Sequence, residues 1–98
     1  MESPPNGTGP KFELGQVVST PGALELLVGA GRSPVEFIAR HAQGDWGDLD
    51  EHDRTVNEQA LLHGGRLLSS YIVVGDQRLW IISEFDRSAT TLLLPSEY

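Results

Sequence analysis

The sequence predicts a single small α+β domain in which one strand comes first, three short helices follow and three strands end the chain. Residues 20–63 place apolar side chains at helical spacing between Pro and Gly punctuation, whereas residues 66–94 hold short runs of β-branched, aromatic and aliphatic residues. A length of 98 residues suits one domain with one modest core. We therefore expect the order β-α-α-α-β-β-β, with three helices packed on a mainly antiparallel sheet.

The first predicted element is a strand over residues 12–18 at the edge of the sheet. Residues 1–10, which precede it, are rich in Pro and Gly and cannot bury enough surface to offset their own ordering, so we expect a disordered tail. The α+β domain then spans residues 11–98. Gly15 interrupts the apolar pattern of the strand and predicts a bulge. The apolar residues of the strand are Phe12, Leu14, Val17 and Val18.

The second predicted element is a helix that begins at Thr20-Pro21, because Thr can cap a helix and Pro fits its first position. Two glycines, Gly29 and Gly31, are expected to end it. The spacing of its apolar residues predicts one buried face. That face comprises Leu24, Leu27 and Val28.

The third predicted element is a helix that begins at Ser33-Pro34 and stops near Gly44. Ser33 stands three residues before Glu36, the spacing of a capping box in which each side chain bonds a free amide of the other residue. The predicted apolar stripe comprises Val35, Ile38 and Ala42.

The fourth predicted element is a helix that begins at Asp48 or Asp50 and ends at about His63, before a Gly-Gly pair. Its predicted buried face comprises Leu49, Val56 and Ala60, with His52 and His63 at the edge of that face. Eleven residues separate the two histidines, which is about 16 Å along a helix, so they cannot ligate one metal ion together.

Three strands are predicted over residues 66–74, 77–85 and 89–94, with Gly75-Asp76 as a two-residue turn between the first two. That turn sets Ile72 opposite Leu79 and Tyr71 opposite Trp80. The second face of the sheet then carries Tyr71, Val73, Trp80 and Ile82, of which Tyr71, Trp80 and Ile82 are the candidates for an interface. Either the helices cover this face or it meets a partner, which includes a second copy of the chain in a homodimer.

The chain is acidic and has no cysteine. Seven Lys and Arg stand against fourteen Asp and Glu, a net charge of −7 at pH 7. Such a charge repels phosphate backbones, so direct nucleic-acid binding is not expected, whereas a protein with a basic surface is a suitable partner. No secretory signal and no apolar run of membrane-spanning length occurs, and we expect a cytoplasmic protein that does not bind membranes.

Five of the fourteen acids lie between Asp45 and Asp53, beside one tryptophan. We interpret this segment mainly as the acid-rich start of a helix, where the macrodipole stabilises carboxylates, with the Trp side chain holding the preceding turn on the core. The first functional hypothesis is a partner-binding surface formed by Asp45, Trp46, Asp48, Asp50 and Glu51. The second is a Ca²⁺ or Mg²⁺ site formed by Asp45, Asp48, Asp50 and Asp53, although the spacing departs from that of an EF-hand.

A polar segment between the last two predicted strands is the second-choice site. It comprises Glu84, Asp86, Arg87 and Ser88. The alternative is a structural hairpin in which Asp86 accepts from backbone amides and Arg87 pairs with an acid. The sequence holds no recognised order of catalytic residues and no phosphate-binding loop, so we assign no catalytic residue, no metal ligand and no cofactor.

Several strings of the sequence resemble those of a family of small bacterial proteins that are usually labelled "plasmid-related protein". The strings are KFELGQVV and TPGAL near the start, GDWG and LWII in the middle, and DRSATT and LPSEY at the end. The resemblance covers nearly all of the chain from Lys11 onward. It implies a setting on bacterial mobile elements and gives no catalytic residues. Some members are labelled as a type I restriction enzyme subunit, but this chain is too short for a methyltransferase or specificity subunit.

These observations together predict a non-enzymatic module that binds another protein, as an inhibitor or modulator of a DNA-processing or defence system. The acidic segment would then face a basic surface of the partner. The alternative is a small metal-dependent hydrolase that uses the acidic loop 45–53 with His52.

Overall fold

The computed structural model describes residues 9–98, so the predicted disordered tail, residues 1–10, lies outside the described part except for its last two residues. The element order confirms the predicted β-α-α-α-β-β-β arrangement and adds a short 3-10 helix at the end. The elements are β1 (Gln16–Ser19), α1 (Pro21–Ala30), α2 (Pro34–Ala42), α3 (Glu51–His63), β2 (Leu67–Val74), β3 (Gln77–Ser83), β4 (Ala89–Leu93) and η1 (Pro95–Glu97). Within residues 9–98, no helix is both long and apolar enough to cross a bilayer.

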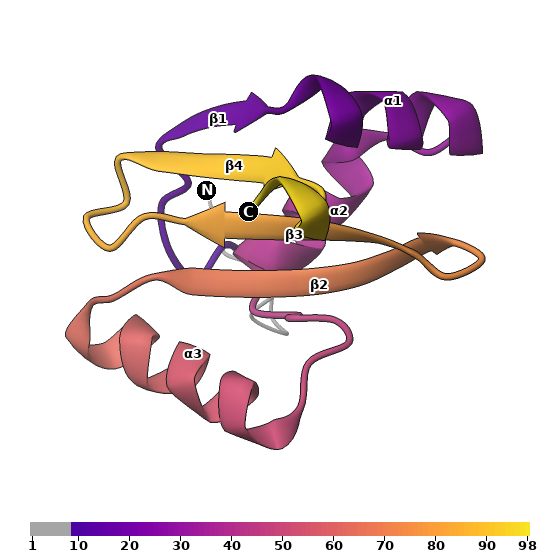
Figure 1. The fold of residues 1–98 in the computed structure, drawn as a ribbon. Coiled ribbons are helices and arrows are strands. Elements are labelled where there is room, and N and C mark those ends of the chain that lie inside the picture. The colour runs from indigo at the N-terminus through magenta and orange to yellow at the C-terminus, as the bar shows by residue number, and fades with distance from the viewer. Residues whose placement is uncertain (1–8) are drawn as a thin grey trace.

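The four strands form one sheet in the order β1-β4-β3-β2 (Figure 1). β2, β3 and β4 are antiparallel neighbours, and β1 lies parallel to β4 at the edge, as predicted for the first strand. β1 is shorter than predicted, because Phe12 and Leu14 precede it. Gly15 is not a bulge within the strand: it lies one residue before it, with φ 66°, where a Cβ would lie 2.3 Å from the Arg87 carbonyl oxygen.

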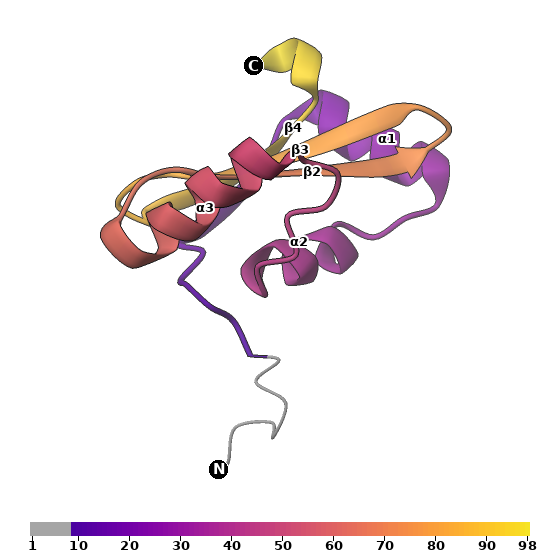
Figure 2. The same cartoon turned by 90° about the horizontal axis from the view of Figure 1, so that it is seen from below.

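The sheet has one covered face and one open face. α1 and α2 both pack on the covered face, and Figure 2 shows α2 on one side of the sheet and η1 on the other. α3 lies along the outer edge of β2 (Figure 1). η1 lies on the open face (Figure 2), and α3 borders that face along β2. The main core, on the covered face, comprises Ala23, Leu27, Phe37, Tyr71, Val73, Leu79, Ile81 and Leu92.

The predicted register between β2 and β3 is wrong by one residue beyond the turn. Val74 pairs with Gln77 as predicted, but an irregularity between Ile72 and Val74 shifts the rest of the strand. Tyr71 therefore pairs with Leu79, and Ser70 pairs with Trp80. Because neighbouring residues of a strand point to opposite faces, this shift moves Tyr71 into the core.

α1 begins and ends as predicted, but its predicted buried face is right only at Leu27. The Thr20 hydroxyl accepts from the Ala23 amide, and Gly31 closes the helix with φ 67°. Ala23 and Leu27, four residues apart, are the buried residues of this helix, whereas Leu24 and Val28 are 46% and 72% exposed. The spacing of the larger apolar residues does not indicate Ala23, whose small side chain lies fully buried in the core face.

α2 has the predicted cap residue but not the predicted capping box. Its predicted stripe is right at Ala42, which is buried, and at Ile38, which packs partly buried against the core, but wrong at Val35. Ser33 accepts from the Val35 amide, and Glu36 pairs with Arg32 instead of returning to Ser33. Val35 is 69% exposed. The buried residues of this helix are Phe37, His41 and Ala42.

α3 begins after Asp50, whose carboxylate accepts from the Asp53 amide, and ends at His63, close to the predicted bounds. Ala60 is buried as predicted, but Val56 is 49% exposed and Asn57 is buried in its place. His52 and His63 are both exposed, so the expectation that they lie at the core edge is wrong.

Candidate functional site

The segment before α3 lies along the outer edge of β2. The Ser70 amide donates to the Trp46 carbonyl at 3.0 Å, and the Asp48 amide donates to the Ser70 carbonyl at 2.6 Å. Gly47 permits this approach, because it has φ 76° and a Cβ would lie 2.2 Å from the Ser70 carbonyl oxygen. Backbone groups that would otherwise stand free at a sheet edge are thereby satisfied.

Asn57 continues this cover from α3. Its amide nitrogen donates to the Leu68 carbonyl at 2.7 Å, and its side-chain oxygen accepts from the Leu68 amide at 3.1 Å. One side chain thus reproduces both hydrogen bonds of a neighbouring strand. This role explains why a polar residue occupies a buried position of the helix.

Trp46 is buried, with 3% of its surface exposed, and therefore does not belong to a partner-binding surface. Its ring stacks on that of Phe12, with the ring centroids 6.3 Å apart and the planes inclined by 23°, and it meets His41 edge-on with centroids 5.8 Å apart. Its indole N–H donates to Glu58 at 2.8 Å. The structure thus supports the structural interpretation, in which Trp46 holds the turn between α2 and α3 on the core.

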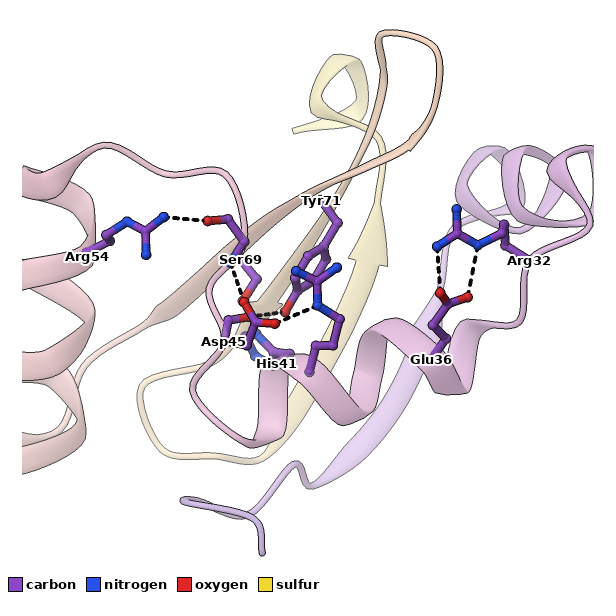
Figure 3. A network of polar contacts seen from close by, with 9 residues as sticks. Arg32, Glu36, His41, Asp45, Arg54, Ser69 and Tyr71 are labelled. Atoms are coloured by element: carbon purple, nitrogen blue, oxygen red, sulfur yellow. Dashed lines mark hydrogen bonds and ion pairs between the residues drawn. The ribbon is translucent and has the colours of Figure 1, made fainter. Parts of the chain in front are cut away.

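Asp45 joins α2 to the sheet. Its carboxylate accepts from Arg40 Nε at 2.6 Å, which is the main reason that the pKa of Asp45 lies below its usual value. Its carbonyl accepts from the Tyr71 hydroxyl at 2.6 Å (Figure 3), and burial raises the pKa of that hydroxyl. The Arg40 guanidinium also lies over the Tyr71 ring.

The other acids of the segment lie apart from one another. Asp48 pairs with Arg78 at 2.6 Å, Asp50 caps α3, and Glu51 points to solvent in the first turn. Among residues 9–98, no three His or acidic side chains converge on a position that could hold a metal ion. The geometry therefore offers no support for the metal-site hypothesis based on Asp45, Asp48, Asp50 and Asp53.

The polar segment at residues 84–88 is a structural connection. Asp86 accepts from the Ser88 amide at 3.0 Å, as the hairpin alternative predicts, and hydrogen bonds from Ser88 lower the pKa of Asp86. Arg87 pairs with no acid among residues 9–98, which corrects that part of the alternative. It has φ 61°, and its guanidinium donates to the carbonyls of Ala60, Gly65 and Glu84. These hydrogen bonds of the guanidinium therefore join the end of α3 to the loop between β3 and β4.

His41, which sequence reasoning did not single out, lies fully buried beneath the sheet. Its Nδ1 lies 2.6 Å from the Ser69 hydroxyl and its Nε2 lies 2.9 Å from the Ser83 hydroxyl. Ser83 in turn lies 2.7 Å from Thr90, which donates to the Leu14 carbonyl at 2.7 Å. The chain of bonds links α2, three strands and the segment before β1.

The Leu14 carbonyl, at one end of this hydrogen-bonded series, can only accept, and it therefore fixes the direction of every hydrogen bond in the series. Thr90 must donate to a carbonyl, so it accepts from Ser83; Ser83 then accepts from His41, whose Nε2 carries the proton. Nδ1 of the neutral ring accepts from Ser69. Burial, together with the charge of Arg87, lowers the pKa of His41 to about 4. Because the ring has no exposed surface, we assign it no catalytic role.

Tyr71, Trp80 and Ile82 do not form one surface. Tyr71 is 1% exposed on the covered face, whereas Trp80 and Ile82 point to the open face. The predicted set is therefore divided, and the remaining two residues belong to a different feature.

That feature is an apolar groove on the open face, between α3, β2, β3 and the C-terminal turn, with a volume of about 260 Å³. Trp80 lies in it, and the Tyr98 ring meets Trp80 edge-on at 5.6 Å. Val56 and Tyr98, which are 49% and 66% exposed, form parts of its rim. The other apolar residues that line the groove are Leu67, Leu68 and Ile82.

A more polar hollow continues the groove along the start of α3. The two share Asp53, Leu68 and Trp80. The continuation also contains Asp48 and Asp50, so two acids that the sequence singled out and the tryptophan of β3 line one continuous depression. The sequence signals of this depression are an acidic helix start and an aromatic strand, which lie far apart in the chain and which residue spacing alone does not bring together.

Comparison of the chain with models of protein families, with curated proteins and with solved structures gave no match.

Proposed function

We propose that this protein is a non-enzymatic interaction module that binds another protein through a basic surface of that partner. The observation that carries the proposal is that the arginine side chains of the protein are occupied by contacts within the fold. Each of the six arginines is bonded within the molecule, whereas exposed acids remain around the fold.

The arginines fall into two groups. Arg32, Arg40 and Arg78 pair with acids. The guanidinium groups of Arg54, Arg66 and Arg87 donate to backbone carbonyls or to the Tyr98 hydroxyl. The exposed acids with no such ion pair among residues 9–98 include Glu13, Glu25, Glu51, Asp53 and Asp76. The net charge of −7 would attract a basic partner electrostatically at long range.

The polar groups of the interior support a binding role in preference to catalysis. Every buried side-chain polar atom described has a hydrogen-bond partner within the molecule, and His41 lies out of reach of solvent. A catalytic centre usually holds groups with unmet hydrogen bonds or perturbed pKa values in an accessible cleft. The resemblance to plasmid-related proteins suggests the setting, a modulator of a DNA-processing or defence protein of a mobile element, where basic nucleic-acid channels are common.

The proposal is tested with the purified protein as bait in a bacterial lysate, followed by reconstitution of any captured complex from purified components. The expected partner is basic, binds at a fixed stoichiometry and dissociates more readily at high salt. The variant pair Glu51→Gln and Asp53→Asn should weaken the complex more than Glu13→Gln with Glu25→Gln, which removes the same charge elsewhere. A partner that binds equally well at high salt, or failure to reconstitute any saturable complex, contradicts the proposal.

A further inference from the structure

We propose that the groove between α3 and the open face of the sheet is the docking site, and that it takes a peptide segment with apolar residues next to Lys or Arg. This inference rests on the proposed interaction function and adds the place and the chemistry of the contact. The groove has two ends of different character, and each end selects one part of the segment.

The apolar end selects the apolar residues. Leu67 and Ile82 form buried walls, while Trp80 lies between the two hollows. Val56 and Tyr98 leave about half or more of their surfaces exposed to water. An apolar side chain of a partner would remove this surface from water. The removal of apolar surface from water is the main favourable term in most protein associations.

The acidic end selects the basic residue. Asp48, Asp50 and Asp53 line it together with Arg78, whose charge is matched by that of Asp48 at 2.6 Å. At this end the carboxylates of Asp50 and Asp53 are therefore in excess beside Trp80. Arg66 lines the apolar end, where it donates to the Tyr98 hydroxyl, so the whole groove keeps a net negative charge of about one. A Lys or Arg of the peptide, next to its apolar residues, would reach this end. The guanidinium or ammonium group of that residue could then form a cation–π contact with the Trp80 ring.

The charge also argues against two other occupants. A second copy of the chain brings a net charge of −7, arginines that are already bonded within its own fold, and a single lysine, Lys11. Residues 1–8 contain no Lys or Arg. A separate basic protein therefore supplies the cation more readily than either of these.

Random displayed peptides of roughly twelve residues, selected on the folded protein, provide the probe. The best peptide is then synthesised, and its binding to the protein and three variants is measured by fluorescence anisotropy. Selected peptides are expected to share apolar residues next to Lys or Arg. Val56→Lys should weaken binding by about tenfold or more, because it removes apolar surface from the rim and adds a charge of the same sign as the Lys or Arg of the peptide. Asp53→Asn should weaken binding and flatten its salt dependence.

Val28→Lys is the matched control, because Val28 is also an exposed helical valine, on α1, and the charge changes equally. It should leave binding within about twofold of wild type. Selection of no peptide, peptides without basic residues, or equal effects of Val56→Lys and Val28→Lys would overturn the inference. A wild-type dimer that Val56→Lys dissociates would assign the groove to a second copy and overturn it too.

The two proposals fail separately. If the lysate partner binds Val56→Lys as tightly as wild type, the interaction function stands and the groove is wrong as its site. If selected peptides bind the groove but no protein partner is reconstituted, the chemistry of the groove stands and the interaction function fails.

Discussion

At the scale of single residues, the buried environment of His41 controls the protonation of its ring. The ring accepts one hydrogen bond and donates another inside the core, so its neutral form satisfies both ring nitrogens. A proton on Nδ1 would place a charge in a site without solvent contact and would force the Ser69 hydroxyl to find another acceptor. The folded protein therefore resists protonation of this ring, whereas the unfolded chain does not.

The stability of the protein should fall as the pH decreases from about 6.5 toward 4. In this window the unfolded chain binds a proton at His41, whose usual pKa is 6.5, while the folded state keeps the ring neutral to about 4. The full effect corresponds to about 3 kcal/mol, of which about 1.4 kcal/mol is lost by pH 5.5. Urea unfolding at about pH 7.5 and about pH 5.5 measures it.

His41→Gln is the comparison for this prediction, because Gln can also accept from one serine and donate to another without titrating. The difference in unfolding free energy between the two pH values should shrink by about 1.4 kcal/mol in this variant. An unchanged difference would place the titrating group elsewhere.

At the scale of elements, the cover of β2 is the feature that joins the loop before α3 to the sheet. Trp46 and Asp48 satisfy the backbone of Ser70, and Asn57 satisfies that of Leu68. An edge strand with free amides and carbonyls can pair with another chain, so this cover also protects the molecule from aggregation through β2.

Gly47→Ala tests the backbone approach of the loop to β2. The change should destabilise the fold by more than about 2 kcal/mol, because a Cβ at this position would lie 2.2 Å from the Ser70 carbonyl oxygen. Gly31→Ala is the control, since its φ of 67° is also positive but nothing lies within 4 Å of its Cβ. It should cost about 1 kcal/mol in thermal or urea unfolding. Equal costs would show that the close approach to Ser70 contributes little.

Asn57→Ala tests the side chain that completes the cover. The loss of both bonds to Leu68 should cost about 2 kcal/mol of unfolding free energy and increase aggregation at high concentration. Gln59→Ala, at an exposed position of the same helix, should be nearly neutral. A neutral Asn57→Ala would mean that water replaces the side chain at the strand edge.

The elements were largely predictable from the sequence because their signals are local. Thr20-Pro21 and Gly31 bracket α1, and Asp50 caps α3, each through a bond within a few residues. Pairing between elements was less predictable. The irregularity beside Val73 shifts the β2–β3 register by one residue, and no feature of the turn at Gly75-Asp76 indicates it.

The buried faces of the helices were predicted less well, for a related reason. Hydrophobicity favoured Val28, Val35 and Val56, all of which are at least 49% exposed. The positions that face the sheet hold smaller or polar residues, among them Ala23 and Asn57, whose value lies in close packing or in a bond to a distant strand. Long-range contacts of this kind are not visible in the spacing of apolar residues.

The candidate site was predicted in part. Asp48, Asp50, Trp80 and Ile82 were singled out from the sequence, and the structure brings them to adjoining hollows of the open face. They had been assigned to two separate features because α3 and β3 lie far apart in the chain. Trp46 was assigned to the surface in one hypothesis, whereas its contacts place it in the core.

At the scale of the whole molecule, the two faces of the sheet have different roles: the covered face forms the core, and the open face carries the groove. The covered face holds the main core, and its buried polar atoms are satisfied within the fold. The open face leaves Trp80 beside a groove with an acidic end, where a partner can bind without disturbing that core. The molecule therefore contains one tryptophan on each side of this division, Trp46 within and Trp80 at the groove.

The two indole N–H signals in a ¹H–¹⁵N spectrum of the labelled protein test the central claim most directly. Trp46 donates to Glu58 from a buried ring and serves as the internal reference. On titration with the basic partner or with the selected peptide, the Trp80 signal should shift progressively while the Trp46 signal stays in place. A complex that forms without moving the Trp80 signal, or that moves only the Trp46 signal, would contradict binding at the open face.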